Sequence, residues 1–483
     1  MPFLSKSPGT YGIYAICISI TIFLSYADLG FLRAGQKYAT ESYARDDRQS
    51  EMKFIGFGAF ILLLFSLVCA IIFFFLSLNP EILIKNLGNH EKIKIASDLL
   101  LILACFTPIT VLQRIFSMIF DIRLEGYIIQ RLILFSSLVS ILSVFYFFRE
   151  NSYEIVLYFL FLQILNLLVV IASAFLIKKR YEYDFVKLLK YTRFNHEVYV
   201  KVKGLAYSGL YVMVVWIIFY ELDQIVIGKF LGVEKVALYS IALVISTFFR
   251  SIFGIIFSPF SVQANYYVGN NDNTGLKSFC LQMYSLSAPV VILPTIAFAL
   301  ISNSLIITWV GPSYTESIKL AILFSLLFSA CFISYTSSMI LVATVRVKEM
   351  YIIATIQALI FWIGVITTYS FLGLFSFALF KLIATFVSEI YYIFILSDFV
   401  KLSIIDLIVK VAYPILIPLI FLMLSLTFAV EFFPNTKSSL NLLIVLGTTG
   451  LCLGISLFLY YFTSLEFRNF TKGFVSNILI SKS

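Results

Sequence analysis

The sequence predicts an all-α integral membrane protein with about thirteen transmembrane helices. Of its 483 residues, 61% are hydrophobic and 13% are charged, whereas soluble domains average roughly 45–50% apolar and about 25% charged residues. The mean hydropathy is +0.99. Long apolar segments alternate with polar loops, and basic residues concentrate in every second loop. Together these three features indicate a chain that crosses a bilayer many times.

Each apolar segment is long enough to span a bilayer, which takes about 20 predominantly apolar residues per helix. The predicted spans are 11–32, 54–78, 98–118, 128–148, 154–177, 205–228, 237–260, 278–302, 318–344, 350–370, 376–397, 411–430 and 441–463. The first span is not a cleavable signal peptide, because it lacks a basic leader and a small-residue cleavage site and further spans follow it.

The basic residues predict the orientation of the chain. One alternating set of loops contains 21 Lys and Arg residues: 33–53, 119–127, 178–203, 261–275, 345–349, 398–410 and the tail 464–483. The loops between them, together with residues 1–10, contain only eight. The positive-inside rule therefore places the first set in the cytoplasm, with the N-terminus outside and the C-terminus inside. This asymmetry accounts for the net charge of +9, so the charge does not call for a nucleic-acid partner.

The loop 178–203 is the longest polar interval and carries eight basic residues among aromatic ones. Two interpretations are compatible with this pattern. The loop is an amphipathic helix on anionic lipid headgroups, or it is a solvated linker between two helical bundles.

Sequence motifs for soluble chemistry are absent. Six cysteines stand singly in apolar runs and are expected to be packing residues: Cys17, Cys69, Cys105, Cys280, Cys331 and Cys452. His90 and His196 lie in polar loops without neighbours at metal-ligand spacing. There is no nucleophile elbow, P-loop or dinucleotide-binding glycine motif. We therefore expect no cofactor, no metal and no enzymatic activity.

An internal repeat relates the two halves of the chain. When Tyr14 is aligned with Tyr239, matches fall at Tyr14, Ile16, Ile20 and Phe23. The second copy is preceded by the span 205–228, whose counterpart would fall before Met1. We therefore expect that the chain begins one helix late, and that an in-frame apolar stretch lies upstream of its start codon. Duplicated halves joined by a basic linker are typical of alternating-access transporters with a site near the bilayer midplane.

The repeat predicts four regions. They are a five-helix bundle at 1–177, a basic cytoplasmic linker at 178–204, a six-helix bundle at 205–400, and two C-terminal helices with a cytoplasmic tail at 401–483. The two bundles are expected to be pseudo-symmetric around a central cavity.

Several motifs resemble one family. Tyr11–Ala15 (YGIYA), Asp28–Gly30 (DLG) and Leu32–Glu41 (LRAGQKYATE) look like the opening signature of Wzx-type polysaccharide (O-antigen) flippases, members of the multidrug/oligosaccharidyl-lipid/polysaccharide exporter superfamily. Asp223–Gly228 (DQIVIG) and Val236–Ser240 look like that family's seventh and eighth helices. The resemblance implies fourteen helices in two lobes around a central cavity. The chain departs from this pattern by its absent first helix.

The resemblance also implies a substrate and partners. The substrate class is an undecaprenyl-pyrophosphate-linked oligosaccharide, such as an O-antigen or other surface-polysaccharide repeat unit of lipopolysaccharide, turned from the cytoplasmic to the periplasmic leaflet of the bacterial inner membrane. Partners would be membrane lipids, a polysaccharide polymerase and a chain-length regulator.

Charged residues inside apolar segments are the candidate site residues, because an ionised group at the bilayer centre costs roughly 2.5–3.5 kcal/mol on insertion scales. Arg250 and Lys381 are the deepest cations, while Arg114 and Arg33 lie near cytoplasmic ends. A guanidinium can bind pyrophosphate oxygens in a bidentate manner, so Arg250 is the best candidate substrate contact. The alternatives are a structural ion pair for Arg250 and interfacial anchoring for Arg33 and Arg114.

The acidic candidates are Asp28, Glu221, Asp223 and Glu389, any of which could carry a coupling ion. On a continuous helix, Glu221 and Asp223 diverge by about 200°, so at most one can face a cavity, and either can be solvated near the outer end of the span. Lys381, Thr385, Ser388 and Glu389 form one helical stripe that should face the protein interior. The stripe binds sugar, or it pairs Lys381 with a carboxylate on another helix.

Three functions compete. The first is a flippase for a lipid-linked oligosaccharide, which the deep cations favour because the substrate is anionic. The second is a multidrug or small-molecule antiporter of the same fold, coupled to a cation, which would need an acidic, aromatic cavity. The third is a membrane polymerase or ligase, which typically carries a large external loop, whereas the longest external loop here is 79–97.

Overall fold

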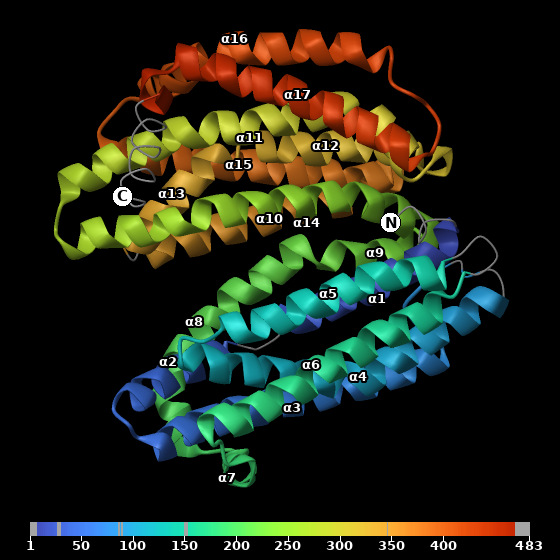
Figure 1. The fold of residues 1–483 in the computed structure, drawn as a ribbon, viewed down its shortest axis with the longest axis vertical. Helices are drawn as coiled ribbons and strands as arrows, with labels where there is room; N and C mark the ends of the chain where they lie inside the picture. Colours follow the sequence, from blue (N-terminus) through green and yellow to red (C-terminus); the bar gives the residue numbers. More distant parts are fainter. Residues whose placement is uncertain are drawn as a thin grey trace. The chain divides into compact units, whose positions relative to one another are not determined.

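The protein is described by a computed structural model over residues 7–26, 30–85, 87, 90–148, 153–344 and 346–468. Over these ranges the regular structure consists of helices alone, without a strand. Among the described residues, ten helices are long and apolar enough to cross a membrane, or up to twelve if each of two bent helix pairs is one span. The predicted all-α, multi-pass membrane fold is confirmed. Contacts divide the chain into a first unit, residues 3–237, and a second unit, residues 238–483 with residues 1–2 (Figure 1).

The first unit is a bundle in which α4 packs against both α3 and α6. Its helices are α1 (Pro8–Tyr26), α2 (Phe31–Ala44), α3 (Arg48–Leu78), the 3-10 helix η2 (Pro80–Ile82), α4 (His90–Ile122), α5 (Tyr127–Phe147), α6 (Ile155–Tyr181), α7 (Phe185–Tyr191), α8 (His196–Tyr220) and α9 (Leu222–Phe230). The helix α3 has 31 residues, about 46 Å at 1.5 Å per residue, so its polar first turns extend beyond a hydrocarbon core of about 30 Å.

Side-chain caps fix the first residues of α3 and α8, two helices that begin in polar segments. Asp47 accepts the Ser50 N–H at 2.9 Å and begins α3. Asn195 accepts the backbone N–H groups of Glu197 and Val198 at 3.0 and 3.2 Å and begins α8. Each cap satisfies N–H groups that have no partner within the helix.

The first predicted span, 11–32, is interrupted. The helix α1 ends at Tyr26, and α2 starts after Gly30, whose φ is 71°. A Cβ on Gly30 would also lie 2.2 Å from the carbonyl oxygen of Ala206, so both the left-handed backbone and the close approach require glycine. Much of the predicted polar loop 33–53 is helix, because α2 is amphipathic and buries Phe31, Leu32, Ala34 and Ala39.

The predicted span 205–228 also differs in the structure. The helix α8 already begins at His196, bends by 63° between Gly204 and Gly209, and ends at Tyr220. The short helix α9 follows. The pair packs against α1 and α2 within the first unit.

The second unit is built around α11, which packs against α12, α13, α16 and α17. Its helices are α10 (Val233–Gly269, starting in the last residues of the first unit), α11 (Asn273–Trp309), the 3-10 helix η3 (Pro312–Tyr314), α12 (Ser317–Ser329), α13 (Phe332–Ala343), α14 (Val347–Leu372), α15 (Leu374–Val400), α16 (Ile404–Val430) and α17 (Ser439–Thr463).

Two features of the second unit position its polar residues. The predicted single span 318–344 is the bent pair α12 and α13, which meet at 47°. The neighbouring helices α14 and α15 pack closely, since a Cβ on Gly364 would lie 1.9 Å from the Phe380 ring. Small residues at such a crossing let membrane helices approach each other.

Candidate functional site

A buried polar stripe runs along α15. The exposed fractions of its side chains are 1% for Lys381 and 4% each for Thr385, Ser388 and Glu389. The predicted inward orientation of this stripe is confirmed. The helical period places these residues on one face, which packs against α12, α13 and α14.

The Glu389 end of the stripe meets the break between α12 and α13. One Glu389 carboxylate oxygen accepts the backbone N–H of Ser334 at 2.9 Å, in the first turn of α13. The Cys331 thiol, at the same break, donates to the carbonyl oxygen of Leu327 at 3.6 Å. From α11, the Ser287 hydroxyl donates to the carbonyl oxygen of Phe332 at 3.1 Å. Side chains from neighbouring helices thus satisfy backbone groups at the break, as an interrupted transmembrane helix requires.

The Lys381 end lies among aromatic and polar groups. Its ammonium nitrogen is 5.2 Å from the centre of the Phe361 ring on α14, within cation–π range. One turn later, Thr385 receives a hydrogen bond from the Gln357 amide, also on α14, at 3.4 Å. A buried cation and a buried carboxylate therefore share one helix face, two turns apart.

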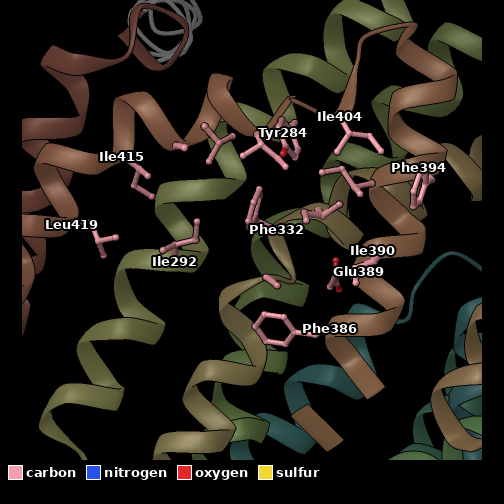
Figure 2. A pocket seen from close by; sticks show the side chains of 16 residues that line it. Tyr284, Ile292, Phe332, Phe386, Glu389, Ile390, Phe394, Ile404, Ile415 and Leu419 are labelled. Carbon is pink, nitrogen blue, oxygen red and sulfur yellow. The ribbon is translucent and has the colours of Figure 1, made fainter. Parts of the chain in front are cut away.

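An apolar pocket of about 530 Å³ adjoins Glu389. Figure 2 shows its aromatic walls, with Tyr284 and Phe332 on one side and Phe386 and Phe394 on α15. Aliphatic residues of α16, among them Ile415, complete it. The pocket is large enough for an apolar group, and its single acidic residue is Glu389.

The remaining cation candidates lie elsewhere. Arg250 is half-buried on α10 in the second unit; the adjacent Phe249 and Phe253 rings stack at 5.5 Å on the buried side of that helix. Arg114 is half-buried on α4 in the first unit. Arg33 is in the first turn of α2, but its side chain is outside the described residues.

Glu221 and Asp223 differ from the expectation of one continuous helix with a solvated carboxylate. Glu221 lies between α8 and α9, so no continuous helix joins it to Asp223. Both side chains are buried, with 5% and 0% exposed, and neither is solvated. Asp223 accepts the Gln224 N–H at 2.9 Å. Asp28 is outside the described residues.

The sequence analysis missed a buried ion pair in the first unit. Arg123 and Glu51 lie 2.6 Å apart, with side chains 3% and 1% exposed. The guanidinium carbon is 5.0, 4.8 and 5.3 Å from the rings of Tyr43, Tyr181 and Tyr183. From the sequence, Arg123 is only a basic residue in the loop 119–127. No local sequence signal marks the pair, because Glu51 and Arg123 each lie near a helix end, where charged residues are common.

A second, exposed group of charges adjoins this pair. Arg180 at the end of α6 lies 2.5 Å from Glu125, and the Tyr181 hydroxyl donates a hydrogen bond to the same carboxylate. The hydrogen bonds from Arg180 and then Tyr181 hold the pKa of Glu125 below its usual range. Two ion pairs therefore link the start of α3 to the end of α4, and the end of α4 to the end of α6.

In the described ranges, no three His, Cys, Asp or Glu residues gather as a metal site. The six cysteines are free thiols, of which Cys105 is exposed and Cys452 is half-buried. The polar groups of the second unit can instead bind an anion at Lys381 or hold a cation at Glu389.

Comparison with known proteins identifies the fold. No protein-family model and no curated protein sequence matches the chain. Among solved structures, the lipid II flippase MurJ in an inward closed conformation superposes with a TM-score of 0.70 and 19% identity, covering 95% of both chains. An inward-facing MATE-family multidrug resistance transporter of the MOP superfamily gives a TM-score of 0.64 and 12% identity, covering 83% of this chain and 94% of that one. The chain therefore has the membrane transporter fold that these proteins share.

Proposed function

We propose that this protein is a flippase, which moves an undecaprenyl-pyrophosphate-linked oligosaccharide across the bacterial cytoplasmic membrane by alternating access. The observation that carries the proposal is the extent of the similarity to MurJ. It covers 95% of this chain, whereas the similarity to the MATE transporter covers 83%. MurJ is described as a flippase of a lipid-linked substrate, lipid II.

Buried positive charge supports an anionic substrate. Lys381 is 1% exposed on the polar stripe, and Arg250 is half-buried in the middle of α10. A pyrophosphate group needs such charge inside the bundle, and the planar guanidinium of Arg250 can bind two of its oxygens at once. Arg114 and Arg33 are the secondary cation candidates.

Glu389 is the leading candidate for ion coupling, ahead of Asp28, Glu221 and Asp223. Its carboxylate is buried and directed at the first turn of α13, so a change in its protonation acts on the break between α12 and α13. Discontinuous helices typically form the substrate and coupling-ion sites of secondary transporters. The orientation that accompanies this proposal places the linker 178–204 and the C-terminus in the cytoplasm. A polysaccharide polymerase and a chain-length regulator are the proposed protein partners.

Reconstituted vesicles test the proposal. Purified protein is inserted into liposomes containing an undecaprenyl-pyrophosphate-linked oligosaccharide, and an impermeant glycosidase measures how fast inner-leaflet glycan becomes accessible. We expect Arg250→Ala to abolish the accelerated phase and Arg250→Lys to retain part of it, since lysine keeps the charge but not the bidentate geometry. The matched control is Arg131→Ala, which removes an exposed arginine from the first unit. Unaccelerated flipping by the wild-type protein would refute the proposal.

A multidrug or small-molecule antiporter is the second candidate, and the pocket beside Glu389 favours it. Aromatic rings line the pocket and can attract a lipophilic cation, and Glu389 is the acidic residue among its lining residues. The discriminating experiment loads the same vesicles with a fluorescent lipophilic cation and applies a proton gradient. Gradient-driven dye movement that Glu389→Gln abolishes, together with no effect on glycan flipping, would select the antiporter.

A further inference from the structure

We propose that the outer face of α7, with the basic residues around it, binds the headgroups of anionic phospholipids. This inference concerns a different surface from the transport site and holds whatever substrate the protein moves. It decides between the two interpretations of the basic loop 178–203.

The helix α7 is amphipathic and is held firmly on the first unit. Leu188 is 7% exposed, and the Phe185 ring packs against Phe116 of α4 at 5.8 Å. At the last residue of α7, the backbone of Tyr191 lies so close to α3 that a Cβ on Gly56 would be 2.6 Å from its carbonyl oxygen. The inner face of α7 is therefore fixed, and so is the direction of its outer face.

The outer face combines apolar and basic side chains. Val186 is 65% exposed and Leu189 is 70% exposed. Lys187 and Lys190 stand beside them and are exposed. A surface helix with exposed aliphatic groups between lysines is suited to the interface between headgroups and acyl chains, where the aliphatic groups enter the apolar region and the lysines meet phosphates.

The position of α7 and the charges around it are consistent with binding to anionic lipid headgroups. The helix begins four residues after the membrane-spanning helix α6 ends at Tyr181, and Figure 1 shows it beside the lower part of α3, against which it packs. Of the acidic neighbours, Asp184 caps α7 and lies 3.5 Å from Lys187, Glu125 pairs with Arg180, and Glu182 is exposed. Further basic residues flank the helix and are exposed: Lys178, Lys179 and Arg193. Each such residue near an anionic leaflet adds favourable binding.

Hydrogen exchange of the full-length protein in lipid nanodiscs tests the proposal. One set of nanodiscs contains phosphatidylcholine alone, and the other contains about one-third phosphatidylglycerol. We expect the amides of residues 186–194 to exchange about tenfold more slowly with the anionic lipid, because opening α7 then requires the lysines to leave the phosphates.

Matched variants identify the cause. Lys187→Gln/Lys190→Gln should remove the difference between the two nanodiscs, and Val186→Asn/Leu189→Asn should speed exchange in both. The control Lys319→Gln/Lys348→Gln removes two exposed lysines from the second unit and should leave the difference intact. The proposal is overturned by equal wild-type exchange in the two lipid compositions, which is the result for a solvated linker. It is also overturned if the control variant loses the difference as fully as the α7 variant.

Discussion

Replacing Arg123 with methionine should destabilise the first unit more than most single substitutions. The change leaves the Glu51 carboxylate buried without its cation, and it removes the guanidinium from between the rings of Tyr43, Tyr181 and Tyr183. Removing one partner of a buried ion pair typically costs about 3–5 kcal/mol. By the scaling for soluble domains of 150–250 residues, the melting temperature should fall by roughly 6–20 °C.

The double variant Glu51→Met/Arg123→Met should recover most of this loss. No hydrogen-bond partner among the described residues is present for the second Glu51 oxygen, so the pair does not fully offset the desolvation of its charges. Replacing a buried pair by apolar residues of similar volume is often neutral or stabilising. We therefore expect the double variant to melt above either single variant.

Thermal unfolding of detergent-purified protein, followed by the loss of the monodisperse peak in size-exclusion chromatography, measures the order of stability. The control is Arg180→Met, which removes an arginine whose side chain is 50% exposed from a surface pair and should change the melting temperature little. The reasoning fails if Arg123→Met melts within about 2 °C of the wild type, which is less than 1 kcal/mol by the same scaling. It fails equally if the double variant is no better than the worse single one.

Three further predictions concern other parts of the chain. Gly364→Val should destabilise the second unit by about 1–3 kcal/mol because its side chain overlaps Phe380, whereas Gly447→Val, with open space around it, should not; thermal melting checks both. The pKa of Asp184 is lowered from 3.8, chiefly because its carboxylate accepts the Lys187 backbone N–H. The ionised carboxylate therefore stabilises the start of α7 fully at pH values above 3.8, and this stabilisation should be lost as the pH falls through the lowered pKa. Amide hydrogen exchange in α7 should then become faster. A reporter fused within 185–195 should be cytoplasmic, and a periplasmic signal would contradict the orientation.

The membrane-spanning elements could be predicted from the sequence because hydrophobic length is a local property. The predicted segment 376–397 lies within α15 (Leu374–Val400), and 441–463 corresponds to α17 (Ser439–Thr463). The inward stripe on α15 followed from the helical period alone. The bend between α12 and α13 could not be predicted this way, since the residues across it are as apolar as the helices on either side.

The ion pair between Glu51 and Arg123 could not be predicted from local sequence either, because it depends on the packing of two distant segments. Glu51 and Arg123 are 72 residues apart, and each lies near a helix end where charge is ordinary. Only the packing of α3 against α4 shows that the two side chains meet in a dry, aromatic environment. The contact of Arg123 with three tyrosines depends on tertiary structure.

Buried carboxylates and helix interruptions coincide in both units. Glu389 accepts an N–H in the first turn of α13, and Asp223 accepts an N–H in the first turn of α9, directly after the break at Glu221. Helix N-termini carry freed N–H groups and a positive partial charge, so an acidic side chain is stabilised there before any ion or substrate binds. A carboxylate within an apolar run can therefore indicate where a helix is interrupted. Glu389 illustrates this, because its buried carboxylate accepts the Ser334 N–H just after the break between α12 and α13.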